Sequence, residues 1–264
     1  MRVSSLALGL RHTCATAKAG NYDMLYCWGS NNSGQLGIGN YTQMNRPTLV
    51  TGSDVAYGPT AGYEHTCVLL VEGTAKCWGL NEKGQLGTGN TSSSNVPVLV
   101  ADDELTSYSK LSAGNMFTCG ITSDGNVRCW GDNTYGQIGN GDPGNNALKP
   151  VQVELPGGAY AQDICTGYGH TCVLTEGGPA FCWGANDMGQ LGNGVTIQAS
   201  TPVLLKVPSQ VVFTSIHCGS AHTCAIDPNG TMYCWGNNMY GQLGTGGSSI
   251  FKTPQPVIWG GGTF

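Results

Sequence analysis

The sequence predicts an all-β protein, and more narrowly a five-bladed β-propeller built from repeats of about 52 residues. One motif, typified by CWGLNEKGQLGTGN, occurs five times, starting at Cys27, Cys77, Cys129, Cys182 and Cys234. Between the copies lie short β-type runs that Gly, Asn, Asp and Pro separate, and no sustained 3.6-residue apolar period indicates a helix. Because five repeats account for the whole chain, we expect a single propeller domain over residues 1–264.

The elements of one repeat follow in a fixed order, which the fourth repeat shows clearly. A run with a proline covers residues 149–155, a longer β-type run covers 161–175, and a run that ends in the motif covers 179–186. The glycine-rich part of the motif, GQLGNG, then forms a loop before the next proline run. Short strands with this punctuation predict four strands per blade.

The middle two strands of each repeat are expected to form a hairpin with a defined register. Pairing Cys119 with Cys129 leaves the three-residue loop Ser123–Gly125 in the third repeat. The same register leaves loops that end in glycine at 71–73, 176–178 and 228–230. A glycine at the third position suits this hairpin because it adopts positive φ without strain.

The chain ends predict how the ring closes. The proline run starts 22 residues before the first hairpin cysteine in three repeats, from Pro97, Pro150 and Pro202. Counting from Pro256 to the C-terminus and then from the N-terminus to Cys14 gives the same total. We therefore expect the C-terminal segment to pair with the N-terminal one and to complete the first blade. As an alternative, it completes the first blade of a neighbouring molecule and builds a chain of subunits.

Twelve cysteines are arranged in pairs. The hairpin register predicts five disulfides, and the two remaining cysteines, at similar places in adjacent repeats, predict a sixth between blades. The predicted pairs are Cys14–Cys27, Cys67–Cys77, Cys119–Cys129, Cys172–Cys182, Cys224–Cys234 and Cys165–Cys218. Disulfides indicate an oxidising compartment, whereas the alternative is reduced cysteine acting as a small buried apolar residue. A zinc site is disfavoured because the pairs lie 10 to 13 residues apart around a ring.

The five nearly identical copies of the motif suggest a functional site, but a structural role explains them better. The glycine loop lacks the Gly-Lys-Ser/Thr ending of a phosphate loop and the helix of a dinucleotide site, so we expect tight turns with the motif leucine packed between blades. We expect the repeated Asn and Gln side chains to cap backbone groups in the turn. The histidines before the Thr-Cys pairs are expected to be packed or hydrogen-bonded: His12, His65, His170 and His222, with Phe117 in the third repeat. His217 stands outside this set and receives no role.

Polar residues outside the motif offer few candidates. Asp102, Asp103 and Glu104 are expected to lie in a solvated loop, with weak cation binding as a minor alternative. Sequons place glycosylation candidates at Asn40, Asn90 and Asn229, whereas Asn31, in a fourth sequon, is expected to be committed to the turn. No nucleophile with a neighbouring base occurs, so we expect no catalytic residue, cofactor or metal ion.

Composition limits the partners. Charged residues make up 10% of the chain, the formal net charge is −5, and no Lys/Arg run exists, which argues against binding nucleic acid. No apolar run has the length of a membrane span. The start, MRVSSLALGLRHTC, resembles a signal peptide, but it aligns with later repeats, so we assign it to the fold and expect any signal to be absent from this chain.

The combined pattern HTC…CWGxNxxGQLGxG…P resembles the repeat of the regulator of chromosome condensation family over essentially the whole chain. The resemblance implies a β-propeller with four-stranded blades. The founding member has seven blades and exchanges guanine nucleotide on a small nuclear GTPase. This chain departs from it in having five repeats and paired cysteines, and in lacking a basic tail and an insertion long enough to act as an exchange wedge. Related propellers in bacteria and at cell surfaces mostly serve as binding platforms, and one of them inhibits β-lactamases.

Three functional hypotheses follow. The first is a non-enzymatic, extracellular or cell-surface scaffold with a protein or glycan partner, with self-assembly into a fibre or surface layer included. The second is a lectin-like or inhibitor-like propeller that binds protein or glycan through its loops. The third is a guanine-nucleotide exchange factor. We expect no nucleic acid partner and no membrane insertion.

Overall fold

The structure, a computed structural model, describes residues 2–19, 22–52, 56–102, 106–207 and 211–260. Five four-stranded antiparallel sheets form five blades, and each blade uses four strands that are consecutive in the sequence. The all-β architecture with five blades is therefore confirmed for the described residues.

The strands are numbered in chain order. Blade 1 consists of β1 (Val3–Leu8), β2 (His12–Ala19), β3 (Tyr22–Gly29) and β4 (Met44–Leu49). Blade 2 consists of β5 (Ala56–Ala61), β6 (His65–Leu70), β7 (Ala75–Gly79) and β8 (Ser94–Leu99). Blade 3 consists of β9 (Tyr108–Ala113), β10 (Phe117–Thr122), β11 (Val127–Gly131) and β12 (Ala147–Val153). Blade 4 consists of β13 (Ala161–Thr166), β14 (His170–Thr175), β15 (Ala180–Gly184) and β16 (Ala199–Leu204). Blade 5 consists of β17 (Ser215–Cys218), β18 (His222–Ile226), β19 (Met232–Gly236) and β20 (Phe251–Pro256).

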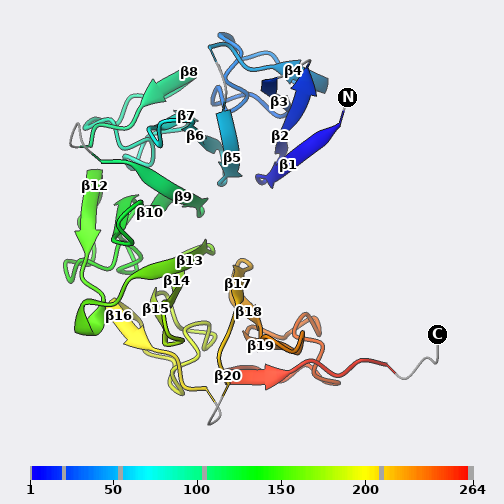
Figure 1. Ribbon diagram of the computed structural model, residues 1–264, viewed down its shortest axis with the longest axis vertical. Helices are drawn as coiled ribbons and strands as arrows, with labels where there is room; N and C mark the ends of the chain where they lie inside the picture. Colours follow the sequence, from blue (N-terminus) through cyan, green and yellow to red (C-terminus); the bar gives the residue numbers. More distant parts are fainter. Residues whose placement is uncertain (1, 20–21, 53–55, 103–105, 208–210, 261–264) are drawn as a thin grey trace.

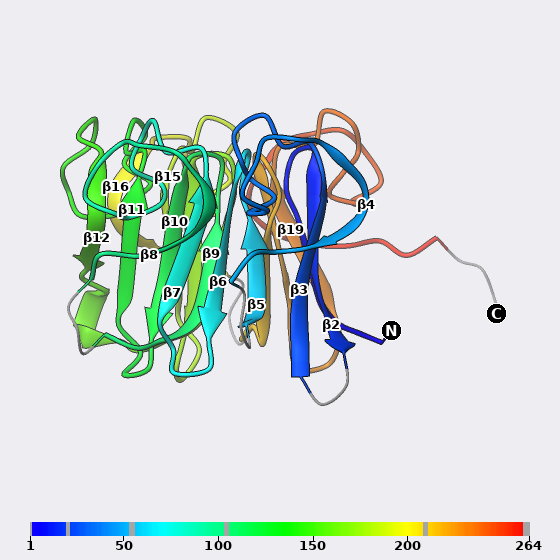
Figure 2. The same ribbon diagram turned by 90° about the horizontal axis from the view of Figure 1, so that it is seen from above.

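The blades follow one another along an arc. Figure 1 shows the first strand of each blade towards the centre of the arc and the fourth strand at its outside. Figure 2 shows the sheets standing side by side, with a short hairpin such as β6–β7 at one edge and the long connections to the fourth strands at the other. A single-turn 3₁₀ helix, Pro156–Gly158, lies between blades 3 and 4. The largest apolar cluster runs through blades 2, 3 and 4, so the core lies between the sheets.

The hairpin register is as predicted. Cys119 lies opposite Cys129 and Ile121 opposite Val127, and the other four blades repeat this pairing of cysteines. The loop glycine of the third blade, Gly125, has φ of +83°. A left-handed residue at this place lets the two strands turn back in three residues.

The proline strand belongs to a different blade from the one expected. In blade 2 it is β8, whose Val98 pairs with Cys77 of β7, so it is the last strand of its own blade and does not open the next one. In blade 5, β20 pairs in the same way, and Pro254 takes the register position of Pro202. Counting from Pro256 therefore started two residues too late.

The predicted pairing of the two chain ends is wrong. Blade 1 already contains four strands of its own, and β20 pairs with β19 in blade 5. A neighbouring molecule cannot supply the missing strand either, because no strand is missing. Figure 1 shows blades 1 and 5 at the two separate ends of the arc.

Candidate functional site: the contact between blades

The repeated motif builds a compact loop that each blade offers to the next. The motif asparagine accepts a hydrogen bond at Oδ1 from a backbone amide five residues later, at 2.9–3.0 Å, as Asn81 does from Leu86. The motif glutamine accepts one at Oε1 from the amide two residues before it, as Gln85 does from Lys83. Both side-chain oxygens accept backbone hydrogen bonds inside the loop, as expected, whereas Gln85 Nε2 is buried without a partner. The motif leucine, replaced by Ile138 in blade 3, is fully buried in each blade.

The main-chain carbonyl of the motif glutamine is the centre of each contact. The carbonyl of Gln85 accepts a hydrogen bond from Trp130 Nε1 at 2.9 Å and another from Thr118 Oγ1 at 3.0 Å, both from the next blade. The same two donors reach Gln35, Gln137 and Gln190. A carbonyl oxygen with two lone pairs is thereby fully used, so four buried contacts have the same polar pairing.

The histidines connect the same threonines to the preceding blade. His65 Nε2 lies 3.0 Å from Thr118 Oγ1, and since that hydroxyl donates to Gln85, the imidazole donates through Nε2–H. Burial lowers the pKa of His65 and His170 to about 3 and that of His12 to about 4. The imidazoles are therefore neutral, and their Nδ1 atoms are buried without a partner. In blade 3, Phe117 takes the place of the histidine, so the contact between blades 3 and 4 lacks this imidazole–threonine hydrogen bond.

The structure joins all twelve cysteines in six disulfides, in the pairs given by the sequence. The hairpin disulfides lie inside the contacts: Cys67 Sγ is 3.8 Å from Thr118 Oγ1 of the next blade. The same hairpin cysteines, Cys14, Cys67, Cys119 and Cys172, are fully buried. Their placement ties each hairpin and packs against the following sheet.

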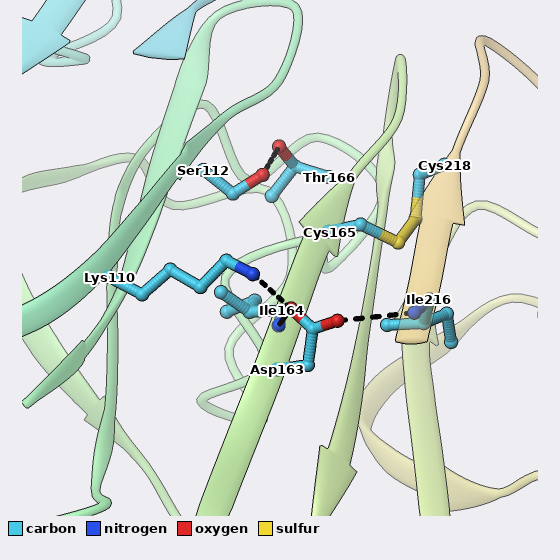
Figure 3. A network of polar contacts seen from close by, with 8 residues as sticks. All are labelled: Lys110, Ser112, Asp163, Ile164, Cys165, Thr166, Ile216 and Cys218. Carbon is cyan, nitrogen blue, oxygen red and sulfur yellow. Dashed lines mark hydrogen bonds and ion pairs between the residues drawn. A yellow bond between two sulfur atoms is a disulfide. The ribbon is translucent and has the colours of Figure 1, made fainter. Parts of the chain in front are cut away.

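The sixth disulfide links β13 of blade 4 to β17 of blade 5. Cys165 lies opposite Cys172, whereas Cys218 lies opposite Thr223, so the two are offset by one residue in their strands. Successive residues of a strand point to opposite faces, and the offset makes the two side chains point towards each other (Figure 3). Beside them, Asp163 bonds Lys110 of blade 3 and the amide of Ile216 in blade 5.

A group with the composition of a metal site does not act as one. His170, Cys172 and Cys218 lie within 4.8 Å of one another. Both sulfur atoms belong to disulfides, and a disulfide sulfur is not the thiolate that zinc binds.

The acidic loop differs from the expectation at Asp102. Its carboxylate pairs with Arg128 at 2.5 Å and accepts a hydrogen bond from the Tyr108 hydroxyl, so it is an ion-pair partner and not a solvated group. Asp103 and Glu104 lie outside the described residues. The sequon residues Asn40, Asn90 and Asn229 are exposed, whereas Asn31 is buried in its loop, with Nδ2 bonded to the carbonyls of Asn40 and Thr42.

Residues from the inner loops of all five blades line an open cavity with a volume of about 410 Å³. Its lining includes Leu10, Tyr63, Asn115, Tyr168 and Ser220. The Asn115 Oδ1 atom is buried without a partner, and both tyrosines are exposed. Sequence reasoning missed this cavity, although one signal was present, because these residues share the place directly after the first strand of each repeat.

Known proteins resemble this chain over most of its length. The model of the RCC1-like domain matches residues 24–262, and that of the Regulator of chromosome condensation (RCC1) repeat matches residues 3–35. The ultraviolet-B receptor UVR8 of Arabidopsis thaliana is 31% identical over 97% of this chain and 58% of its own length. The human E3 ubiquitin-protein ligase HERC2 is 30% identical over 88% of this chain and 5% of its own length. The chain thus spans little more than half of UVR8 and a small part of HERC2.

Solved structures show the same fold. Human WBSCR16 superimposes with a TM-score of 0.87 at 21% identity, over 98% of this chain and 67% of that one. Yeast RCC1 (Prp20), in a structure with Kap60, gives 0.62 at 18% identity, over 97% of this chain and 75% of that one. Among the described residues, no helix has the length and apolar character to cross a membrane.

Proposed function

Because this chain belongs to the RCC1-like domain family of β-propellers, we propose that it is a non-enzymatic extracellular scaffold that binds proteins and associates with copies of itself. The observation that carries the extracellular part is the complete pairing of twelve cysteines, since reducing compartments keep thiols free. Self-association is supported by the composition, since a charged fraction of only 10% adds little electrostatic repulsion between copies.

The test combines thiol chemistry with hydrodynamics on protein from its native source. We expect no alkylation of the intact protein and twelve alkylated cysteines after reduction, read as a mass shift. We also expect a sedimentation coefficient that rises with protein concentration. Free thiols in the native protein would contradict the extracellular assignment, and a strict monomer would contradict self-association.

Glycosylation gives an independent test of the secreted assignment. Asn40, Asn90 and Asn229 are exposed sequon residues, and we propose them as glycan carriers in a eukaryotic secretory host. Peptide N-glycosidase treatment should lower the mass of the wild type, and the shift should disappear in the triple Asn→Gln variant. A glycan found on the buried Asn31 would overturn this assignment of sites.

The open cavity favours a second candidate function, the binding of a protein or glycan segment. The two exposed tyrosines that line it, Tyr63 and Tyr168, offer a stacking surface for such a ligand. A glycan array and a peptide library should show a ligand whose binding is lost in Tyr63→Ala and retained in Tyr160→Ala, a change at an exposed tyrosine that does not line the cavity. Equal binding by both variants would exclude the cavity.

The third hypothesis, nucleotide exchange, remains a prediction. A structure of the yeast relative Prp20p is described together with its binding to Gsp1p and histones, at 19% identity to this chain. Nucleotide release from a small GTPase would test it.

A further inference from the structure

We propose that a hollow between blades 3, 4 and 5 binds an arginine side chain that projects from a protein partner. The hollow has a volume of about 330 Å³, and Tyr135, Tyr168 and Asp187 are among the residues that line it. It lies at the edge of the blades that carries the long motif loops (Figure 2). We call it the tyrosine hollow. This inference rests on the proposed protein binding and names one site and its ligand chemistry.

Tyr168 forms the wall between the tyrosine hollow and the larger cavity of the inner loops, since it lines both. Its backbone amide donates a hydrogen bond at 3.0 Å to the carbonyl of Ser220 in blade 5, which fixes the residue at the contact between the two blades. The side chain is nevertheless exposed. Because its place holds other residue types in other repeats, a tyrosine is not needed there to build a blade. The counterparts are Leu10, Tyr63, Asn115 and Ser220.

Tyr135 reaches the same hollow from the motif loop of blade 3. Its ring lies against the backbone of Gly169, where an added Cβ atom would be 2.8 Å from Tyr135 Cδ2. The absence of a side chain at Gly169 therefore makes room for the ring of Tyr135 in the hollow that Tyr168 also lines. Every other repeat has a side chain at this place, namely Arg11, Glu64, Met116 and Ala221.

Asp187 supplies the charge of the tyrosine hollow. Its Oδ1 atom accepts a hydrogen bond from Gln190 Nε2 at 3.2 Å, and Gln190 is itself held by the amide of Met188, which donates to its Oε1 at 2.9 Å. The carboxylate is thereby oriented by the loop. Asp187 is exposed, and its Oδ2 atom has no hydrogen-bond partner among the described residues, so it can accept from a ligand.

The loops around the hollow carry negative charge only. Asp132 is buried and accepts hydrogen bonds from Thr134 and Gln137, which leaves Asp142 and Asp187 as the exposed carboxylates. An anionic ligand is repelled at this edge and a cationic one is attracted. Lysine and arginine are absent from all the loop segments of blades 3, 4 and 5 at this edge, which are 114–116, 132–146, 167–169, 185–198, 219–221 and 237–250.

Two aromatic rings beside a carboxylate suit a guanidinium better than other groups. The planar guanidinium stacks on a ring face and still directs N–H groups in its plane towards a carboxylate. The compact ammonium of lysine is attracted to a ring but has no such fork. A neutral sugar stacks on tyrosine as well, yet it leaves the negative charge of Asp187 unused. The charge and the rings together therefore favour arginine.

The experiment first selects ligands for the folded wild type from a phage library of random peptides. The most enriched peptide is synthesised together with a copy in which citrulline replaces arginine, because citrulline keeps the shape of the side chain and lacks its charge. Fluorescence anisotropy then measures the Kd of both peptides at low and at high salt. The same wild-type protein is also applied to a glycan array.

Two variants alter the hollow, and each has a matched control. Asp187→Asn removes the charge with little change of shape, and Asp142→Asn removes the same charge from an exposed carboxylate of this edge that does not line the hollow. Tyr168→Ala removes one ring, and Tyr160→Ala removes a ring that is 57% exposed elsewhere. Circular dichroism verifies that all four variants are folded.

We expect the selected peptides to be enriched in arginine, and the citrulline copy to bind about tenfold more weakly. Asp187→Asn should weaken binding of the arginine peptide by about tenfold and Tyr168→Ala by about fivefold, whereas both controls should bind as the wild type does. Binding should also weaken at high salt, and less so in Asp187→Asn.

Three results would overturn the tyrosine hollow and leave protein binding intact. The first is a set of selected peptides without arginine, and the second is unchanged binding of the arginine peptide to Asp187→Asn. The third is an equal loss in Asp187→Asn and Asp142→Asn, which would show that only the net charge acts. A glycan as the sole ligand, lost in Tyr168→Ala, would exclude arginine in favour of a sugar. A wild type that selects neither peptide nor glycan would overturn the proposed binding function as well.

Discussion

At the residue scale, one carbonyl per blade holds the molecule together. The side chains of Asn81 and Gln85 fold the loop around the carbonyl of Gln85, which then receives Trp130 and Thr118. The motif is thus a rigid acceptor presented to the next sheet. The recurrence of the motif follows from this role, because each residue in it either shapes the loop or fills the contact.

Removing the indole from an internal contact should cost far more than removing it from the end. Trp130→Ala deletes a fully buried side chain and its hydrogen bond, and we expect a loss of about 3–5 kcal/mol in the free energy of unfolding. Trp28→Ala, at a half-buried indole, is the matched control and should lose on the order of 1–2 kcal/mol. Urea denaturation at a protein concentration low enough to prevent association measures both, and equal losses would contradict the assigned roles.

The buried histidines predict sensitivity to acid. Burial lowers the folded-state pKa of His65 and His170 to about 3, from 6.5. Between those pH values the unfolded chain binds more protons than the folded one, so their contribution is present above pH 6.5 and is lost as the pH falls towards 3. Stability should therefore decrease over that window.

The variant His65→Phe tests this pH dependence, because Phe117 shows that blade 3 accepts a phenyl ring at the same position. Its denaturation midpoint should decline less steeply between pH 7 and pH 4 than that of the wild type. An identical slope in the two proteins would mean that His65 titrates equally in both states.

At the scale of the element, the two strands of a hairpin are joined by a short loop, whereas the fourth strand of each blade follows a long one. The cysteine register was readable from the sequence because the two strands of a hairpin are joined by three residues. The partner of the proline strand was not readable, since β8 can be reached from β7 only through the long motif loop. Pro254 and Pro256 lie two residues apart, so only the strand register shows that Pro254 is the counterpart of Pro202.

The interblade disulfide gives a prediction for elements distant in sequence. Cys165 and Cys218 close a loop with a sequence separation of 53, against 10 for Cys119 and Cys129. The chain-entropy model gives about 4 kcal/mol for the first and about 3 kcal/mol for the second. The double Cys→Ser variant of the interblade pair should therefore lose about 4 kcal/mol in urea denaturation, and retention of wild-type stability would refute the assignment.

At the scale of the whole molecule, the five blades form an open arc whose ends are not paired with each other (Figure 1). The same contact occurs four times, each time between two consecutive blades. Within the described residues, the stability is therefore approximately a sum over blades and over the contacts between neighbouring blades.

The proposed self-association predicts a concentration effect on thermal stability. Association that requires folded copies raises the melting temperature by mass action. The Tm of the wild type should rise with protein concentration in scanning calorimetry. A Tm that does not change with protein concentration would contradict self-association.

The sequence by itself determined the all-β class, the five repeats, the hairpin register and the cysteine pairs, because these follow from local periodicity and short loops. Only the tertiary structure decided which blade contains each proline strand, that Asp102 pairs with Arg128, and that β20 pairs with β19 in blade 5. These depend on contacts between segments far apart in the chain, whose geometry no local pattern encodes. The exposed Leu6 and the buried Ile164 have the same place in their repeats, and only the presence of a neighbouring sheet distinguishes them.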